Sequence, residues 1–321
     1  MKPSVLLEVV ENFMPFVPYP VKGEAADCDL CGSSEKILIC EYDRRLKRLT
    51  TVTCKRCGLM RTDPMPTEAE LAHYYSEVYR WDYQPAGSGP PRRHMLIKTR
   101  DAEQRLSLLA PVMRPGMRIL DFGSGAGAFL GAAAAAGHSV VGLEPGRVFG
   151  NYARETFGVE VIVEHWERVN QKLGPFDLIT TTQVVEHLRR PVAAMRWLTS
   201  LLAPDGVLYV TVPNLLRNPK QPFRRFHFAH VHGFTPDVLE RAGAVCGLTP
   251  DPRVPPDGTK IVFRKSPQGP QAPSYDWNYG EQVKSLFPQT SVARFVLSGE
   301  WLLAAGRRLR NAVNNSRGPI N

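Results

Sequence analysis

The sequence lacks a long apolar run, an internal repeat and a continuous basic segment. Its longest apolar candidate, residues 131–143, is rich in alanine and is interrupted by Gly137 and His138. It falls short of the roughly 20 residues that a membrane-spanning helix needs, which excludes the membrane-spanning class. The first residues carry two glutamates within their apolar run and no small-residue cleavage site, so we expect no secretory signal and a cytoplasmic location.

Cysteine is scarce, and the basic residues are distributed along the whole sequence. Four of the six cysteines lie in two close pairs, which without an export signal favours metal-bound thiolates in a reducing compartment over disulfides. The formal net charge of +9 comes from scattered residues and short groups. A nucleic acid is therefore a less favoured partner than a small phosphate-bearing molecule, although the charge leaves it open.

The 321 residues suit one full α/β domain with a smaller appendage. Composition separates four segments. These are a cysteine-containing module (1–62), a tyrosine-rich helix with a linker (63–91), a domain of alternating strand-like and helix-like patterns (92–265), and a Pro-rich connector with a basic amphipathic helix (266–321).

Within the large domain the alternation predicts a parallel sheet with crossover helices. We expect strands at 117–122, 139–143, 159–163, 176–181 and 207–212, and helices at 93–109, 128–136, 147–157, 191–202 and 236–246. A hairpin of residues 248–254 and 260–264 should close the sheet. This periodicity alone does not distinguish among doubly wound folds.

A glycine-rich turn follows the first of these strands. Asp121 ends the strand, and Gly123, Gly125 and Gly127 open the next helix. Such a turn lets the backbone approach a nucleotide-like ligand at a helix N-terminus. By itself it fits either S-adenosylmethionine (SAM) or NAD(P). Glu144, just after the second strand, is placed to bind both hydroxyls of a ribose.

Two later stretches carry a resemblance to a known family. FDLITTTQVVEHLRRP (176–191) and LLAPDGVLYVTVPN (201–214) resemble the fourth-strand and fifth-strand motifs of class I SAM-dependent methyltransferases. The resemblance covers about residues 92–265 and implies a Rossmann-like methyltransferase sheet. It implies that Asp121 and the glycine turn surround the methionine part of SAM and that Glu144 holds the ribose. Trp166 would flank the adenine, and Gln183 would line the sulfonium.

A histidine-rich stretch, FHFAHVHGFTPDVLE (226–240), is the candidate acceptor loop, because methyl transfer needs alignment of the acceptor and removal of its proton. It resembles the H-x-x-x-F-[ST]-P stretch of sugar methyltransferases, which places His230 at the position of their proposed base, with His232 as a second candidate. Ala229 stands where those enzymes often have Glu, which leaves C-, O- and N-methylation open. A metal site formed by His227, His230 and His232 is disfavoured, because no carboxylate lies at ligand spacing among them. The histidines could equally only shape a loop.

A tyrosine-rich segment precedes the large domain. In the related sugar enzymes such a helix covers SAM and the acceptor, which makes Tyr75, beside Tyr74 and Tyr79, a candidate catalytic residue. Tyrosines at this spacing are also typical of simple packing.

The paired cysteines predict a structural zinc site. Two C-x-x-C pairs, separated by residues 32–53, form a closed tetrahedral set of thiolates; the ligands are Cys28, Cys31, Cys54 and Cys57. Cys40 and Cys246 are expected to be buried thiols.

A zinc module ahead of a SAM domain resembles two groups. One is the nucleotide-sugar and glycan methyltransferases, and the other comprises ribosomal RNA base methyltransferases, in which the module would hold RNA. We favour the first, with a small-molecule or glycan acceptor: a nucleotide-linked sugar, a surface glycan or a glycosylated natural product. A third hypothesis is an inactive zinc-ribbon interaction protein. The amphipathic helix expected at 291–310 could contact a membrane surface or pack on protein. The sequence leaves the oligomeric state open.

Overall fold

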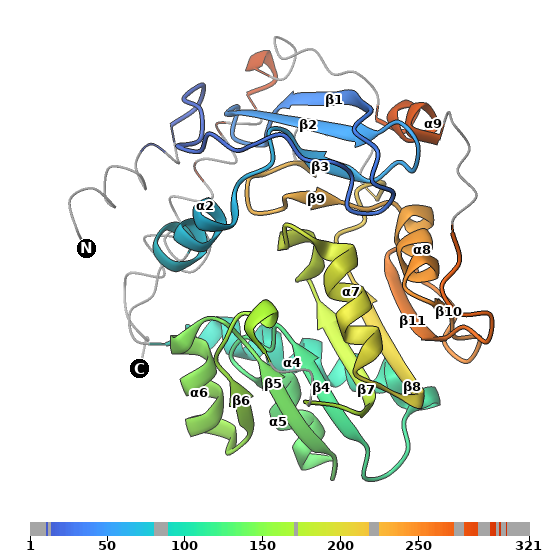
Figure 1. Ribbon diagram of the computed structural model, residues 1–321. Helices are drawn as coiled ribbons and strands as arrows, with labels where there is room; N and C mark the ends of the chain where they lie inside the picture. Colours follow the sequence, from blue (N-terminus) through green and yellow to red (C-terminus); the bar gives the residue numbers. More distant parts are fainter. Residues whose placement is uncertain are drawn as a thin grey trace.

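The computed structural model describes residues 11, 14–79, 89–169, 173–217, 225–272, 279–287, 296–299, 302 and 306. Two sheets organise this part of the chain (Figure 1). A seven-stranded sheet has the order β10-β11-β8-β7-β4-β5-β6, and a four-stranded sheet has the order β1-β2-β3-β9. Most of the helix expected at 291–310 lies outside the described residues. Among the described helices, none is long and apolar enough to cross a membrane.

The large sheet is mainly parallel, which confirms the predicted α/β, Rossmann-like fold. Five strands run parallel, and two follow in antiparallel pairing at one edge. The parallel strands are β4 (Arg118–Phe122), β5 (Ser139–Leu143), β6 (Glu160–Ile162), β7 (Phe176–Thr182) and β8 (Leu202–Thr211), and the antiparallel ones are β11 (Lys260–Lys265) and β10 (Leu248–Pro250).

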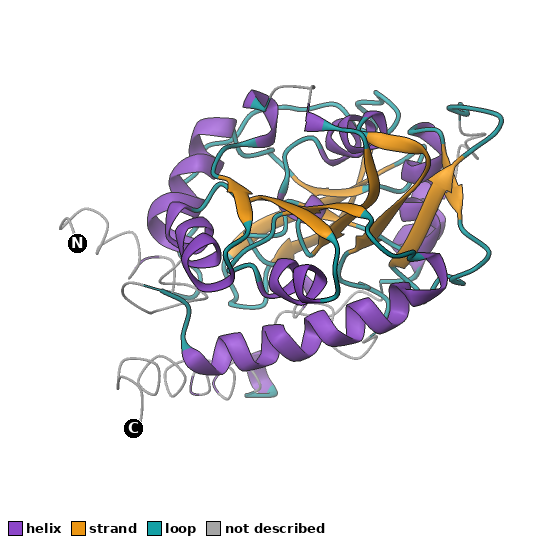
Figure 2. Cartoon of the chain, turned by 90° about the horizontal axis from the view of Figure 1, so that it is seen from below, coloured by secondary structure: helices purple, strands orange, loops and turns teal. Residues whose placement is uncertain are grey.

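Helices cover both faces of this sheet (Figure 2). Because side chains alternate along a strand, Ile119 packs with α4 (Arg92–Leu109) and α5 (Ala128–Ala135). Its neighbour Leu120 belongs to the opposite layer, with α7 (Pro191–Ser200) and α8 (Pro236–Val245). Helix α6 (Arg147–Phe157) packs on β6 and α5. Strands buried on both faces explain the near-continuous apolar runs of the sequence.

Three predicted boundaries were wrong by two or more residues. Strand β8 begins at Leu202, not at 207, because Leu202 pairs with Phe176 across a register shift; α7 accordingly ends at Ser200. Strand β10 ends at Pro250, because the Asp251 carboxylate accepts hydrogen bonds from the backbone and side chain of Arg253 and turns the chain.

The small sheet combines segments that are far apart in the sequence. Its strands β1 (Lys36–Tyr42), β2 (Arg48–Cys54) and β3 (Met60–Thr62) come from the cysteine-containing part, whereas β9 (His232–Gly233) belongs to the histidine-rich stretch. Helix α9 (Tyr279–Ser285) packs against β1 and β2. The acceptor-loop candidate is therefore built into the sheet of the cysteine-containing part (Figure 1).

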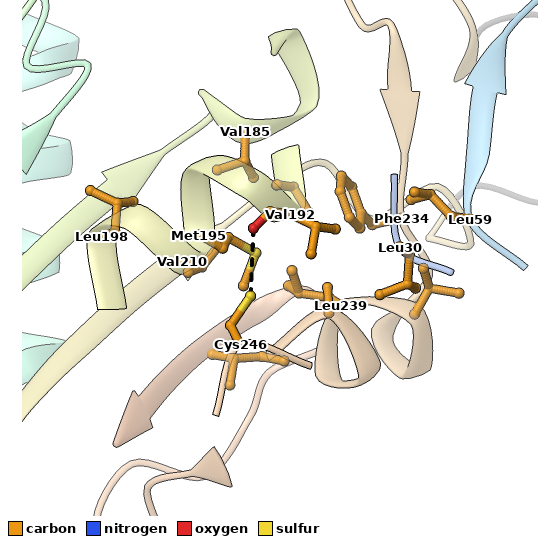
Figure 3. Close-up of a cluster of buried hydrophobic side chains, with 14 of the residues drawn as sticks. Leu30, Leu59, Val185, Val192, Met195, Leu198, Val210, Phe234, Leu239 and Cys246 are labelled. Carbon is orange, nitrogen blue, oxygen red and sulfur yellow. Dashed lines mark hydrogen bonds between the residues drawn. The ribbon is translucent and has the colours of Figure 1, made fainter. Parts of the chain in front are cut away.

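One apolar core joins the two sheets (Figure 3). Leu30 and Leu59, from the cysteine-containing part, share it with Val192, Phe234 and Leu239. Burial of each side chain of this size contributes about 1.5–3 kcal/mol to the stability of the folded state. The cysteine-containing part and the large domain therefore stabilise each other.

A polar contact adds to this core. Asp29, inside the first cysteine pair, accepts hydrogen bonds from the backbone N–H groups of Val192 (2.6 Å) and Ala193 (3.4 Å). Its carboxylate thereby satisfies two of the otherwise unpaired donors at the N-terminus of α7. The first cysteine pair is thus attached to the helix that follows the loop after β7.

Candidate functional site

The glycine turn has the backbone that its sequence predicts. Gly123, Gly125 and Gly127 all have positive φ, of 74°, 54° and 79°. A Cβ on Gly123 would lie 2.4 Å from Val184, and one on Gly127 would lie 2.5 Å from Ala153, whereas one on Gly125 would meet nothing within 4 Å. The first and third glycines permit close packing, and the middle one borders open space where a ligand can approach.

Glu144 lies against this turn. Its carboxylate accepts hydrogen bonds from the backbone N–H groups of Gly125 (2.9 Å) and Gly146 (2.8 Å). Strand β5 runs beside β4, so their carboxyl ends bring the acid and the turn together. The two elements predicted to bind the cofactor are therefore adjacent.

Asp121 is buried and engaged with protein groups. Its Oδ1 accepts hydrogen bonds from Arg105 Nη1 (3.0 Å) and Thr180 Oγ1 (2.5 Å). Burial raises the pKa of this carboxyl, and the Arg105 guanidinium opposes that rise. These contacts fix the end of β4 beneath the turn.

The remaining cofactor candidates lie on flanking loops. Trp166 is partly buried and packs on Trp197 of α7, with ring centroids 5.8 Å apart. Gln183 is exposed directly after β7, with a positive φ of 56°, and its backbone N–H donates to Thr211 O (2.8 Å). This conformation is uncommon for a residue with a side chain and is enriched at functional sites.

Four polar side chains meet next to Val184, the residue that contacts Gly123. Glu186 Oε1 lies 3.8 Å from His187 Nε2 and 3.9 Å from His230 Nε2. His187 Nδ1 lies 2.6 Å from the carbonyl oxygen of Ala229, and the Tyr75 hydroxyl donates to the same oxygen (2.8 Å). We call Tyr75, Glu186, His187 and His230 the acceptor cluster. The structure thus brings together two predicted catalytic residues, Tyr75 and His230.

Burial governs the protonation of this cluster. It raises the pKa of Glu186 to about 8 and lowers that of His187 to about 4. It also holds the pKa of His230 well below its usual range, and the charge of His187 adds to this effect. The imidazoles are consequently neutral near pH 7, with a nitrogen lone pair available.

The other two histidines of the stretch occupy different places. The ring of His227 lies 3.8 Å from that of His230. His232 lies in β9 and is only 3% exposed, and its Nδ1 is 2.9 Å from Leu188 O. His232 thus contacts the backbone of the loop after β7. It does not belong to the group of Glu186, His187 and His230, whose side chains could hold a metal ion together.

The sequence did not identify Glu186, because no carboxylate lies at ligand spacing among the histidines of the 226–240 stretch. Sequence spacing does not reveal it, because Glu186 and His230 come from different loops. The available signal was its position, four residues after the end of a buried strand that neighbours the cofactor turn.

The paired cysteines converge. Cys28 Sγ lies 3.4 Å from Cys57 Sγ, and Cys31 Sγ lies 3.5 Å from Cys54 Sγ. All four sulfurs are within 4.8 Å of one another. These distances are too long for disulfide bonds of about 2.05 Å and suit four thiolates about 2.3 Å from one ion. The donor set therefore fits zinc.

Comparison with known proteins decides the nature of the large domain. Residues 92–251 match the family model described as a methyltransferase domain. The chain contains a methyltransferase domain. It is 29% identical over 173 residues to the C-methyltransferase NovU of Streptomyces niveus, a match covering 52% of this chain and 38% of that protein. It is 30% identical over 164 residues to the ubiquinone biosynthesis O-methyltransferase of Dinoroseobacter shibae, covering 47% and 65% respectively.

A solved structure similar to this chain is that of magnesium protoporphyrin IX methyltransferase from Synechocystis PCC 6803 with bound S-adenosylhomocysteine (SAH). The TM-score is 0.45 at 15% identity, and the match covers 61% of this chain and 97% of that one. The alignments with the two curated relatives span less than two thirds of their length.

Proposed function

We propose that this protein transfers a methyl group from SAM to a sugar or glycan-type acceptor, with zinc held by its cysteines. The observation that carries the proposal is the common position of the glycine turn and the acceptor cluster. Val184 contacts Gly123 and lies two residues before Glu186, so the two sites share the carboxyl edge of the sheet. Open α/β sheets bind their ligands at this edge. The curated relatives, named as C- and O-methyltransferases, support the same chemistry.

The cofactor would lie over Gly125, where the backbone borders open space. Glu144 would accept hydrogen bonds from the ribose hydroxyls. Its carboxylate has about four lone-pair positions, so these bonds can be added to those from the backbone. Trp166 would offer an apolar face to the adenine, and Gln183 would lie near the sulfonium.

In the reaction, an electron pair of the acceptor atom attacks the methyl carbon. The new bond forms as the carbon–sulfur bond breaks, the bonding pair stays on sulfur, and SAH leaves. The acceptor's proton must also depart. The neutral imidazole of His230 can take the proton directly. Alternatively, His230 would bind a cation that lowers the pKa of the acceptor group, and the proton would pass to water. Tyr75 would align the acceptor across the cluster.

The position of β9 favours a sugar or glycan over RNA. Strand β9 completes the sheet of the cysteine-containing part and follows His230 closely in sequence. The cysteine-containing part therefore supports the acceptor loop, whereas an RNA-binding module would be expected to present a basic surface of its own. In the alternative of an inactive interaction protein, nothing would preserve the contact of Glu144 with the glycine turn.

Titration of the zinc-replete protein with SAH tests the cofactor site. We expect micromolar binding that Glu144→Ala weakens about tenfold to a hundredfold, since hydrogen bonds to a charged group contribute about 1.5–3 kcal/mol. Glu155→Ala, at an exposed position of α6, is the matched control and should bind like the parent protein. Absence of SAH binding would favour the inactive interaction protein.

A further inference from the structure

The acceptor cluster contains an unusual buried acid. Glu186 is 1% exposed, and neither of its carboxylate oxygens has a hydrogen-bond partner on any other described residue. A buried carboxylate without donors carries a large desolvation cost, so such groups are normally paired or coordinate metals. The groups that face Glu186 Oε1 are the Nε2 atoms of His187 and His230.

A hydrogen bond on the side of the ring away from Glu186 fixes the orientation of His187. Its Nδ1 must donate, because its close neighbour at 2.6 Å is the carbonyl oxygen of Ala229. The lone pair is then on Nε2, which points towards Glu186. The Tyr75 hydroxyl donates to the same carbonyl and helps to hold it. Metal-binding histidines are typically oriented in this way, with the far nitrogen donating to a backbone carbonyl.

We propose that Glu186, His187 and His230 bind a divalent transition-metal cation, which receives an oxygen of the acceptor at an open position. The three ligand atoms lie within 4.8 Å of one another. An ion between them would be roughly 2.2–2.5 Å from each, so a contraction of a few tenths of an ångström reaches ordinary bond lengths. Two imidazoles and one carboxylate on one side of an ion are a donor set that leaves open positions.

The site is fully buried on the side of the acid and partly exposed on the side of the histidines. The His187 and His230 side chains are 16% and 19% exposed, in contrast to Glu186. An acceptor can therefore approach past the imidazoles. The proposal rests on the proposed function, and it narrows the acceptor to a molecule that presents an oxygen to the cation. The cation would lower the pKa of an acceptor hydroxyl, so that its proton could pass to water and the oxygen could attack the methyl group.

Cobalt titration of protein whose cysteine site is filled with zinc tests this proposal. We expect one equivalent of Co²⁺ to bind with the weak visible bands of nitrogen and oxygen ligation and without a thiolate charge-transfer band. Glu186→Gln should weaken this binding at least about tenfold, because replacing even an outer partner of a ligand costs 10–100-fold. Glu240→Gln, at an exposed position of α8, is the matched control and should bind cobalt normally.

Folding of Glu186→Gln is checked by circular dichroism, and His230→Gln serves as a second variant with the same expected loss. Failure of the parent protein to bind cobalt, or a spectrum showing only thiolate ligation, would overturn the proposal. SAH titration of the same sample separates the two proposals. SAH binding without cobalt binding would reject the cation and leave the proposed function standing.

Discussion

Replacing Cys54 with serine is expected to remove zinc and to unfold the small sheet. Cys54 is the last residue of β2 and is fully buried. Its Sγ lies 3.5 Å from Cys31 Sγ. Binding of structural zinc contributes about 10–16 kcal/mol of free energy to the folded state of zinc-finger peptides. This is comparable with the whole free energy of unfolding of a typical domain, about 5–15 kcal/mol. The folded state of this part should not persist without the ion.

The loss of stability in Cys54→Ser should extend beyond the cysteine-containing part. Strand β9 pairs with β3, and Leu30 and Leu59 share a core with Val192. We therefore expect a lower melting temperature of the whole protein by calorimetry, together with loss of zinc by elemental analysis. Cys40→Ser is the matched control, because Cys40 lies outside the group of four and its thiol donates to Tyr42 O. Equal zinc content and melting temperature in Cys54→Ser and the parent protein would refute the zinc assignment.

His230→Ala is expected to lower the rate of methyl transfer about 10²- to 10⁴-fold, the usual contribution of a group that assists proton removal. Both routes for removing the proton use this imidazole, whereas the glycine turn and Glu144 do not contact it. The affinity for SAH should therefore stay within a factor of about two. The measurement is a single-turnover rate with saturating SAM, alongside an SAH titration.

A second histidine provides the control. His138 immediately precedes β5, so it lies at the amino edge of the sheet, opposite the acceptor cluster. His138→Ala should leave the rate of transfer unchanged. An equal fall in both variants would indicate a general loss of folded protein, and an unchanged rate in His230→Ala would remove His230 from the reaction.

Local patterns predicted much of the fold. Strand β5 and helix α6 have the predicted boundaries, because their apolar periodicity and flanking glycines are visible in a short window. The C-x-x-C spacing likewise identified four cysteines that the structure brings together, since each pair folds within a few residues.

Contacts between distant segments could not be predicted in this way. Strand β9 has two residues, and its pairing depends on β3, far earlier in the chain. The same limitation applies to Glu186, whose proximity to His230 follows from the packing of two loops. A sequence window contains the residues of one loop at a time, so it does not show that the Glu186 carboxylate lies beside His230.

The most direct test of the proposed function is a transfer assay with SAM labelled in its methyl group, in which nucleotide-linked sugars and ribosomal RNA are offered in parallel and the products are identified by mass spectrometry. We predict label in a sugar product, with SAH released in equal amount. His230→Ala should form both products much more slowly than the parent protein does. Label in RNA alone would contradict the assignment of the acceptor and support the RNA methyltransferase alternative.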